Sequence, residues 1–173
     1  MRLMRISTRN SVRLSPLFLA AVLAAGGCAS SKPQPAPWNV SITRETPAPI
    51  EVDLIGVTEA EKPFWAGCDL DKYWTLGDPL RRQQVDKLSM TLKSNQPAIL
   101  QRDDPKWKDW LSRGATDLLI IANFPGQFAP GPTDPRRKFL PLDKKSWDAK
   151  NQTLEIRVQD TLIRVQTPQK PRR

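Results

Sequence analysis

The stretch that decides the fold is DLLIIANF, residues 117 to 124, which is apolar at almost every position. Gly114 precedes it and Pro125-Gly126 follows it, and such residues are typical of turns. A strand with one exposed face alternates apolar and polar side chains, whereas an unbroken apolar run of this length is typical of a strand buried on both faces. We therefore expect residues 117 to 124 to form a central strand.

The segment just before this strand predicts a short helix. Asp104-Pro105 offers a capping carboxylate and a proline whose φ angle suits the first helical turn. Trp107, Trp110 and Leu111 follow at the spacing i, i+3, i+4, and Gly114 supplies a left-handed stop. We expect these tryptophans to pack in the core rather than to bind a ligand. The same helix-start signal occurs at two other places, Asp78-Pro79 and Asp134-Pro135.

Three further segments alternate apolar with polar residues, which is the pattern of a strand with one buried face. They cover residues 40 to 42, 50 to 54 and 88 to 92. Together with the central strand and a hairpin near the carboxy terminus, they predict a mainly β protein. We expect a sandwich of mostly antiparallel strands with two or three short helices in its connections.

The terminal hairpin is predicted by TLEIRVQDTLIRVQT, residues 153 to 167. A two-residue turn at Gln159-Asp160 places all the apolar side chains on one face, and Arg157 and Arg164 on the other. The pairs expected from this turn are Val158 with Thr161, Ile156 with Ile163 and Leu154 with Val165. Because Gln-Asp is not the Asn-Gly that such turns prefer, a slightly longer loop is the alternative.

The amino terminus predicts an export signal, residues 1 to 27. Four arginines and no acidic residue precede an apolar run of about 12 residues, which is shorter than the roughly 20 that a membrane-spanning helix needs. Ala25-Gly26-Gly27 supplies the small residues of a cleavage site, and Cys28 follows at once. This resembles the bacterial lipobox, in which cleavage after Gly27 exposes Cys28 for acylation, although Ala25 stands where leucine is usual. The alternative is an ordinary signal cut nearby, for example after Ser30, which would leave a soluble secreted protein.

The rest of the chain predicts one folded domain on a tether. Residues 28 to 37 comprise the cysteine and a stretch in which proline alternates with small residues, and nine such residues span roughly 28 Å in a polyproline II conformation. Residues 38 to 166 suit one domain, and residues 167 to 173 a basic disordered tail. Loss of the signal and its four arginines leaves 23 basic and 18 acidic residues, a formal net charge of +5 instead of +9. This modest charge does not require a nucleic-acid partner.

Chemistry-bearing motifs are scarce. The chain has no histidine, which excludes Ser-His-Asp and Cys-His machinery, and it has no glycine-rich phosphate loop and no CxxC pair. Three pairs of carboxylates stand where helix starts and turns need acids: Glu59 with Glu61, Asp69 with Asp71, and Asp103 with Asp104. We therefore expect no catalytic residue, no metal and no cofactor. A hydrolase that uses two of these acids in one pocket is the alternative.

Cys68 is the second cysteine of the chain. If Cys28 is acylated, Cys68 has no intramolecular partner and is expected to be buried as a small apolar residue. If Cys28 is not acylated, a disulfide between the two cysteines is the alternative.

The order of these elements resembles the TssJ family, the outer-membrane lipoproteins of the type VI secretion system. Between the lipobox and the terminal hairpin, the resemblance is carried by PIEVDLIGV, EKPFW, CDLDKYWTLGDPLRR, KLSMTL, LLIIANF and KFLPLD. Within it, the counterparts of the family's aromatic segment and Leu-Gly-Asp helix start are Phe64, Tyr73, Trp74, Leu76, Gly77 and Asp78.

The resemblance implies a transthyretin-like antiparallel β-sandwich without catalytic activity. It implies acylation of Cys28, with palmitate among the chains, and transfer to the outer membrane, since Ala29 and Ser30 rather than an aspartate follow the cysteine. The domain would face the periplasm and bind the periplasmic domain of a TssM-like inner-membrane component, with no small-molecule substrate. The alternative is a general envelope lipoprotein that binds peptidoglycan or another periplasmic partner.

Two candidate contact regions follow from the resemblance. Family binding is attributed to the loop between the first two strands, here residues 43 to 49 with Arg44, Glu45 and Thr46, although the family's usual Asn-Pro start is missing. The second candidate is the acidic and aromatic segment 62 to 78, in which exposed Trp65, Tyr73 or Trp74 could serve as interface anchors, with core packing as the alternative for each.

Overall fold

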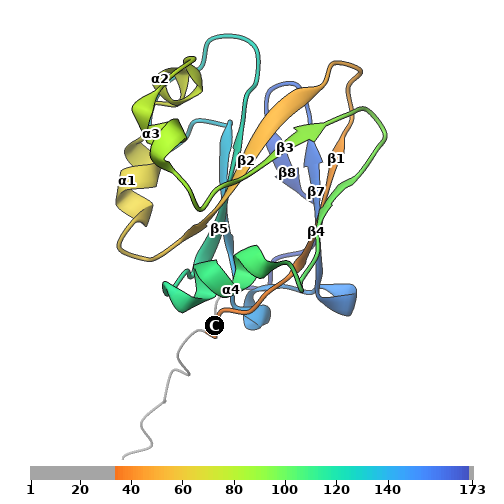
Figure 1. Cartoon of the computed structure of the whole chain (residues 1–173). Helices are drawn as coiled ribbons and strands as arrows, with labels where there is room; N and C mark the ends of the chain where they lie inside the picture. The colour runs from red at the N-terminus through yellow and green to blue at the C-terminus, as the bar shows by residue number, and fades with distance from the viewer. Residues whose placement is uncertain (1–33, 172–173) are drawn as a thin grey trace, which may run out of the picture. The chain divides into compact units, whose positions relative to one another are not determined.

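Residues 34 to 171, which the computed structural model describes, build two four-stranded sheets that pack face to face (Figure 1). Sheet I has the order β4 (Ala98–Leu100), β1 (Asn39–Arg44), β7 (Thr153–Val158) and β8 (Ile163–Val165). Sheet II has the order β3 (Leu88–Leu92), β2 (Ile50–Val57), β5 (Asp117–Ala122) and β6 (Arg137–Pro141). All pairings are antiparallel except that of β1 with β7. The predicted mainly β sandwich and its strands are confirmed.

The central strand β5 is buried at all six positions, as its apolar run predicts. It lies between β2 and β6, so its backbone is paired on both edges. Leu118 and Ile120 point into the core between the sheets, whereas Leu119 and Ile121 belong to a second apolar cluster on the other face. This explains why the sequence of β5 shows no alternation.

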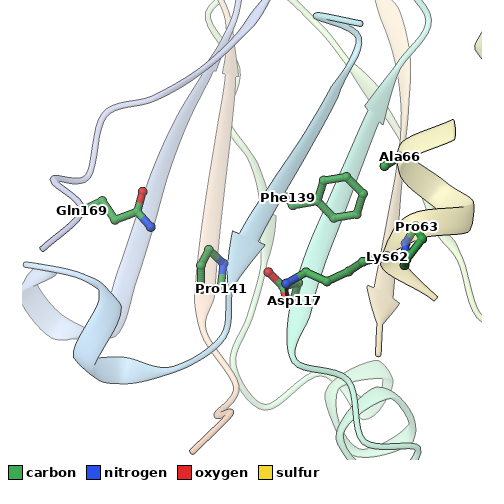
Figure 2. Close-up of a pocket in the computed structure, with 7 residues that line it drawn as sticks. All are labelled: Lys62, Pro63, Ala66, Asp117, Phe139, Pro141 and Gln169. Atoms are coloured by element: carbon green, nitrogen blue, oxygen red, sulfur yellow. Dashed lines mark ion pairs between the residues drawn. The ribbon is translucent and has the colours of Figure 1, made fainter. Parts of the chain in front are cut away.

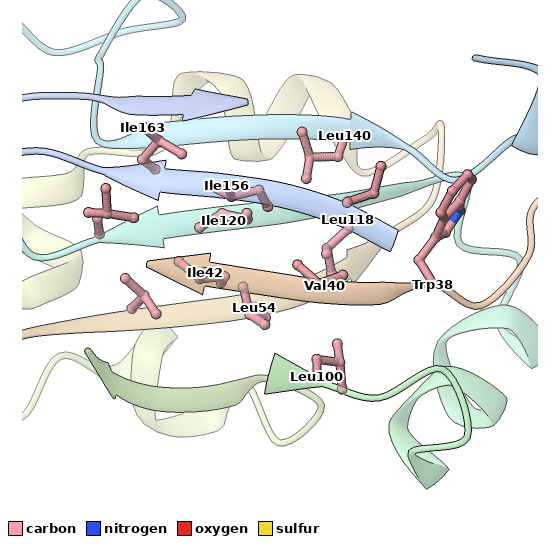
Figure 3. Packing of buried hydrophobic residues seen from close by; sticks show 14 of the residues in the cluster. Trp38, Val40, Ile42, Leu54, Leu100, Leu118, Ile120, Leu140, Ile156 and Ile163 are labelled. Atoms are coloured by element: carbon pink, nitrogen blue, oxygen red, sulfur yellow. The ribbon is translucent and has the colours of Figure 1, made fainter. Parts of the chain in front are cut away.

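The main core is formed by the inward faces of both sheets (Figure 3). Sheet I contributes Val40, Ile42 and Ile156, which face Leu54 and Ile120 of sheet II. All of them are completely or almost completely buried, and burial of such side chains stabilises the fold by about 1.5 to 3 kcal/mol each.

Three short helices cover the outer face of sheet II: α1 (Lys62–Gly67), α2 (Leu70–Trp74) and α3 (Pro79–Gln83) (Figure 1). Trp65, Leu70 and Tyr73 from α1 and α2 pack on Ile55 and Leu119 of the sheet. The Arg137 guanidinium adds a polar link, since it donates hydrogen bonds from β6 to the carbonyl oxygens of Trp65 and Cys68. The sequence predicts only the start of α3, because five or six residues are too few to show a helical period.

The predicted helix before the central strand is α4 (Pro105–Ser112). The Asp104 carboxylate accepts a hydrogen bond from the backbone N–H of Lys106, and Gly114 ends the segment with φ +84°. Trp107 and Trp110 are buried, as expected. The Trp110 indole lies directly on Gly56 of β2, where a methyl group would come within 2.3 Å of its Cγ atom.

Two local predictions need correction. The two-residue turn at Gln159-Asp160 is wrong and the alternative of a longer loop is confirmed: the β7–β8 loop has four residues, 159 to 162, so Val158 pairs with Ile163 and Ile156 with Val165. The slip is two residues, which leaves every side chain on its predicted face because the strand period is two. Asp134-Pro135 begins no helix; the Asp134 carboxylate instead closes a tight turn by accepting from the Arg136 N–H, and β6 starts one residue later.

Both predicted boundaries of the folded domain also change. Part of the predicted tether and part of the predicted tail are hydrogen-bonded to the β6–β7 connection. That connection carries two short 3-10 helices, η1 (Lys144–Ser146) and η2 (Lys150–Gln152). At the amino-terminal side, the Ala36 N–H donates to the Leu142 carbonyl oxygen at 3.1 Å, so the folded domain starts before residue 38. At the carboxy-terminal side, Thr167 is buried and the Lys170 N–H donates to Ser146 at 2.9 Å. Residues 167 to 170 are therefore part of the domain and no disordered tail.

Candidate partner-binding surfaces

The strand register gives the sandwich two distinct ends. At the N-terminal end, residues 34 to 38 lead into β1, and β7 begins beside it because the two strands are parallel. At the opposite end, which we call the loop end, four connections lie: 45–49, 93–97, 123–136 and 159–162. The first candidate region, the β1–β2 loop, is therefore separated from the N-terminal end by the full length of β1.

Arg44, a predicted contact residue, is buried and organises the loop end from within. Its Nε donates to the Ala48 carbonyl oxygen at 3.1 Å, which folds the β1–β2 loop back on itself. Its two terminal nitrogens donate to the Gln159 carbonyl oxygen at 2.6 Å and to the Asp160 carboxylate at 2.9 Å. With 1% of its surface exposed, this side chain holds two loops together and is not accessible to a partner.

Glu45 and Thr46 lie in the same loop but differ in exposure and in hydrogen bonding. The exposed Glu45 carboxylate accepts hydrogen bonds from Gln159 at 2.7 Å and from Arg157 at 2.8 Å, and these two bonds lower the pKa of Glu45. The Thr46 hydroxyl is buried and has no hydrogen-bond partner. The β1–β2 loop is thus bound to the β7–β8 hairpin through Glu45, and Thr46 leaves one polar atom unsatisfied.

Two of the three predicted aromatic anchors are core residues. Trp65 is 3% exposed and Tyr73 is 1% exposed. The Tyr73 hydroxyl donates to the buried Asp53 carboxylate at 2.8 Å, and burial together with this carboxylate raises the pKa of Tyr73 well above its ordinary value. Core packing is therefore the correct interpretation of both residues.

Trp74 is partly exposed, and the guanidinium of Arg81 stacks on its ring at 4.2 Å from the centroid. Beyond it, Leu76 projects fully into solvent from a turn in which the Asp78 N–H donates to Thr75 and Gly77 has φ +84°. Phe64 on α1 is 55% exposed. Both residues lie in the predicted contact segment 62 to 78, but the sequence does not single them out as exposed, since nothing in the pattern separates them from their buried neighbours.

The β5–β6 connection, residues 123 to 136, is a loop that the sequence analysis did not single out. Phe124 is buried at its start, and the Phe128 ring lies 6.2 Å from it. Asp134 and Arg136 are buried at its end, where the guanidinium donates to both carboxylate oxygens over 2.7 to 3.1 Å. Arg136 also bonds to Asp71 of α2 and lies over the Phe128 ring at 4.8 Å. Figure 1 shows this connection rising beside α2.

A shallow pocket of about 340 Å³ lies between α1 and the end of β6 (Figure 2). Lys62 reaches across it to form an ion pair with Asp117 at 2.9 Å. Phe139, Pro141, Pro63, Ala66 and Gln169 complete the lining. Since Asp117 is the single carboxylate in this lining, the pocket lacks the second acid that the hydrolase alternative needs.

The predicted carboxylate pairs have local structural roles, and Asp69 and Asp104 are helix caps as expected. Asp69 accepts hydrogen bonds from the N–H groups of Asp71 and Lys72 at the start of α2, and Glu61 accepts one from Thr58 at 2.9 Å. Within residues 34 to 171, no group of three acidic or cysteine side chains is arranged to hold a metal ion. No helix of this part of the chain is long and apolar enough to cross a membrane.

Cys68 is half-buried beside the α1–α2 cluster rather than fully buried, and it is a free thiol. Burial raises its pKa. The predicted acylation site Cys28 and the cleavage site Gly27 lie outside the described residues.

No protein-family model matches the chain, and no curated protein matches it in sequence. Solved structures do share its fold. A chain of a structure described as "Type VI membrane complex" aligns at a TM-score of 0.53 with 13% identity, over 76% of this chain and 98% of that chain. This chain therefore has the same fold as a component of that complex.

Two further structures are similar. "T6SS protein TssM C-terminal domain (869-1107) from EAEC" aligns at a TM-score of 0.50 with 10% identity, over 74% of this chain and 98% of that chain. The T6SS lipoprotein TssJ1 from Pseudomonas aeruginosa aligns at 0.47 with 12% identity, over 80% and 100%. At these identities the likeness concerns the fold alone, and it agrees with the predicted β-sandwich that the two sheets form.

Proposed function

We propose that this protein is an outer-membrane lipoprotein that tethers the membrane complex of a type VI secretion system. In this proposal residues 1 to 27 are removed, Cys28 is acylated, and the domain faces the periplasm, where it binds the periplasmic domain of a TssM-like inner-membrane component. Its role is mechanical and non-catalytic. Two or more acyl chains give stable anchoring, since each buried methylene contributes about 0.8 kcal/mol.

The observation that carries the proposal is that the N-terminal end and the loop end lie at opposite ends of the sandwich. Cys28 precedes the first described residue, Gln34, by only a few positions, and Gln34 leads into the N-terminal end. The four connections of the loop end lie at the far ends of β1 and β2. A domain anchored through Cys28 would therefore present the loop end away from the membrane. The fold shared with chains of type VI assemblies supports the same role.

Membrane attachment is tested by fractionating cells that produce the wild-type chain and the variant Cys28→Ala. We expect the wild type in the outer-membrane fraction, with an intact mass that shows acylation at the new amino terminus, and the variant released from it. The matched control Cys68→Ala should behave as wild type. A Cys28→Ala chain that stays in the membrane fraction would overturn the anchor.

Partner binding is tested by mixing the purified mature chain with the periplasmic carboxy-terminal domain of the TssM-like protein of the same organism. An interface of standard size, about 1,600 Å² in total, supports affinities from micromolar to picomolar. We expect a complex in size-exclusion chromatography and a dissociation constant in this range. Absence of binding between two folded proteins, together with sedimentation of the chain on purified peptidoglycan, would favour a general cell-wall-binding lipoprotein instead.

A further inference from the structure

We propose that the β5–β6 connection, residues 123 to 136, is the principal partner-binding surface, and that it binds an uncharged segment of the partner. This inference rests on the proposed function, because it names the surface through which that function would be exercised. It differs from the expectation carried by the family resemblance, which puts the binding site in the β1–β2 loop.

Length sets this connection apart from its neighbours at the loop end. Fourteen residues separate the end of β5 at Ala122 from the start of β6 at Arg137. The other three connections have four or five residues each. Connections in compact domains usually have about 4 to 6 residues, and irregular loops as long as this one usually serve a function when they are ordered.

The exposed part of this connection is free of charge. From Leu118 to Thr133 the sequence contains no Asp, Glu, Lys or Arg, although charged residues make up 26% of the chain. Exposed positions in this stretch include Gln127, Ala129 and Pro130. A charged partner group would be desolvated here without an opposite charge to compensate it, so the surface suits an uncharged segment.

The connection is also held in position at its base before any partner arrives. The buried Arg136 guanidinium bonds to the Asp134 carboxylate and to Asp71 of α2, and it covers the ring of Phe128. Phe128 packs in turn against the core through Phe124. Because these contacts are made during folding, binding loses less conformational entropy, which favours affinity.

Two of the neighbouring loops, 45–49 and 159–162, offer less to a partner because charged groups in them are already bonded within the domain. Glu45 of the β1–β2 loop is bonded to Arg157 and Gln159. Asp160 of the β7–β8 loop is bonded to Arg44. A partner that used these groups would first have to break internal hydrogen bonds.

The experiment introduces charges of both signs at one exposed position of the connection. The mature wild-type chain and the variants Ala129→Glu and Ala129→Lys are titrated with the purified periplasmic carboxy-terminal domain of the TssM-like protein. The matched controls are Ala48→Glu and Ala48→Lys, at an exposed alanine of the β1–β2 loop. Thermal unfolding of each variant confirms that the fold is intact.

Both Ala129 variants should bind at least about tenfold more weakly than wild type, which corresponds to about 1.4 kcal/mol, whereas both Ala48 variants should stay within about twofold. Because no charge pair is involved, raising the ionic strength from about 0.1 M to about 1 M should leave the wild-type affinity nearly unchanged. Loss of binding in the Ala48 variants alone, or an Ala129 effect for one sign of charge only, would overturn this inference and leave the proposed function intact. Absence of wild-type binding would overturn both.

Discussion

The guanidinium of Arg44 lies 2.9 Å from the carboxylate of Asp160, although 1% of the arginine side chain and 64% of the aspartate side chain are exposed. The same guanidinium donates to the carbonyl oxygens of Ala48 and Gln159. One buried cation thus ties the β1–β2 loop to the β7–β8 loop. The geometry of the loop end therefore depends on a buried residue, because Arg44 holds the exposed residues of both loops in place.

Replacement of this cation should be costly. We predict that Arg44→Ala lowers the free energy of unfolding by about 3 kcal/mol, because two carbonyl oxygens lose their donor and the side chain leaves a void. Asp160→Asn should cost less than about 1 kcal/mol, since its carboxylate is mostly exposed and Arg44 keeps its two carbonyl partners. Urea unfolding of both variants measures the difference. Equal effects of the two substitutions would show that the interior bonds of Arg44 contribute little.

The contact between Gly56 and Trp110 gives a second prediction. A Cβ atom on Gly56 would lie 2.3 Å from the Trp110 Cγ atom, so Gly56→Ala must displace the indole or bend β2. We predict a loss of about 1 to 3 kcal/mol, the usual cost of overpacking. Gly67→Ala is the control, because apart from its chain neighbours and the backbone of its own helix no heavy atom lies within 4 Å of the added methyl group. It should be neutral or stabilise by up to about 1 kcal/mol. Unfolding midpoints of the two variants that coincide would contradict this account.

The elements that the sequence predicts correctly are those long enough to show a regular pattern of apolar side chains. The unbroken run of β5 correctly predicts burial on both faces, and the alternation in β1 and β3 predicts one buried face each. For β2 the prediction of one buried face is wrong, because α1 and α2 cover its second face and only Glu51 is exposed. The β7–β8 register shows the limit of such patterns. A shift by two residues changes no face, so only the loop length separates the two registers, and Gln159-Asp160 is a weak turn signal.

The candidate site was harder to predict because its residues act through tertiary contacts. Arg44 lies at the end of β1, on the same face as the apolar residues Val40 and Ile42. A cation at the end of a strand would be expected to turn into solvent. Arg44 is instead buried, because backbone carbonyl groups from two loops converge on it. Trp65 and Tyr73 stand in helices of six and five residues, which are too short to reveal an inward face. Asp134 carries a helix-start signal, but its carboxylate is used by Arg136 two residues later.

Tyr73 is the only tyrosine of the chain, which makes its titration directly measurable. Burial and the nearby Asp53 carboxylate raise the pKa of this phenol in the folded state. A phenol in the unfolded chain ionises near pH 10, so the stabilisation from Tyr73 is present below about pH 10 and is lost as the pH rises beyond it. We predict that the ultraviolet absorbance of tyrosinate appears near pH 10 in urea but only together with unfolding in buffer.

The variant Tyr73→Phe checks the sign of this effect. It removes the hydrogen bond to Asp53 at neutral pH, which should cost about 1 to 2 kcal/mol because the buried carboxylate loses one donor while keeping Arg81 and Ser89. Above about pH 10 the stability of wild type should fall more steeply than that of the variant. Parallel pH profiles would mean that Tyr73 ionises freely in the folded protein.

Cys68 provides the last prediction, since burial raises the pKa of its thiol. The thiolate is the reactive form, so at about pH 8 iodoacetamide should modify Cys68 more slowly in the folded protein than in urea. The folded-state rate should keep rising with pH beyond the point where the rate in urea levels off. Mass spectrometry counts the labels, and Cys68→Ser locates them: an acylated chain should take one label and its Cys68→Ser variant none. Equal rates in buffer and in urea would show that the half-buried position of Cys68 does not protect it.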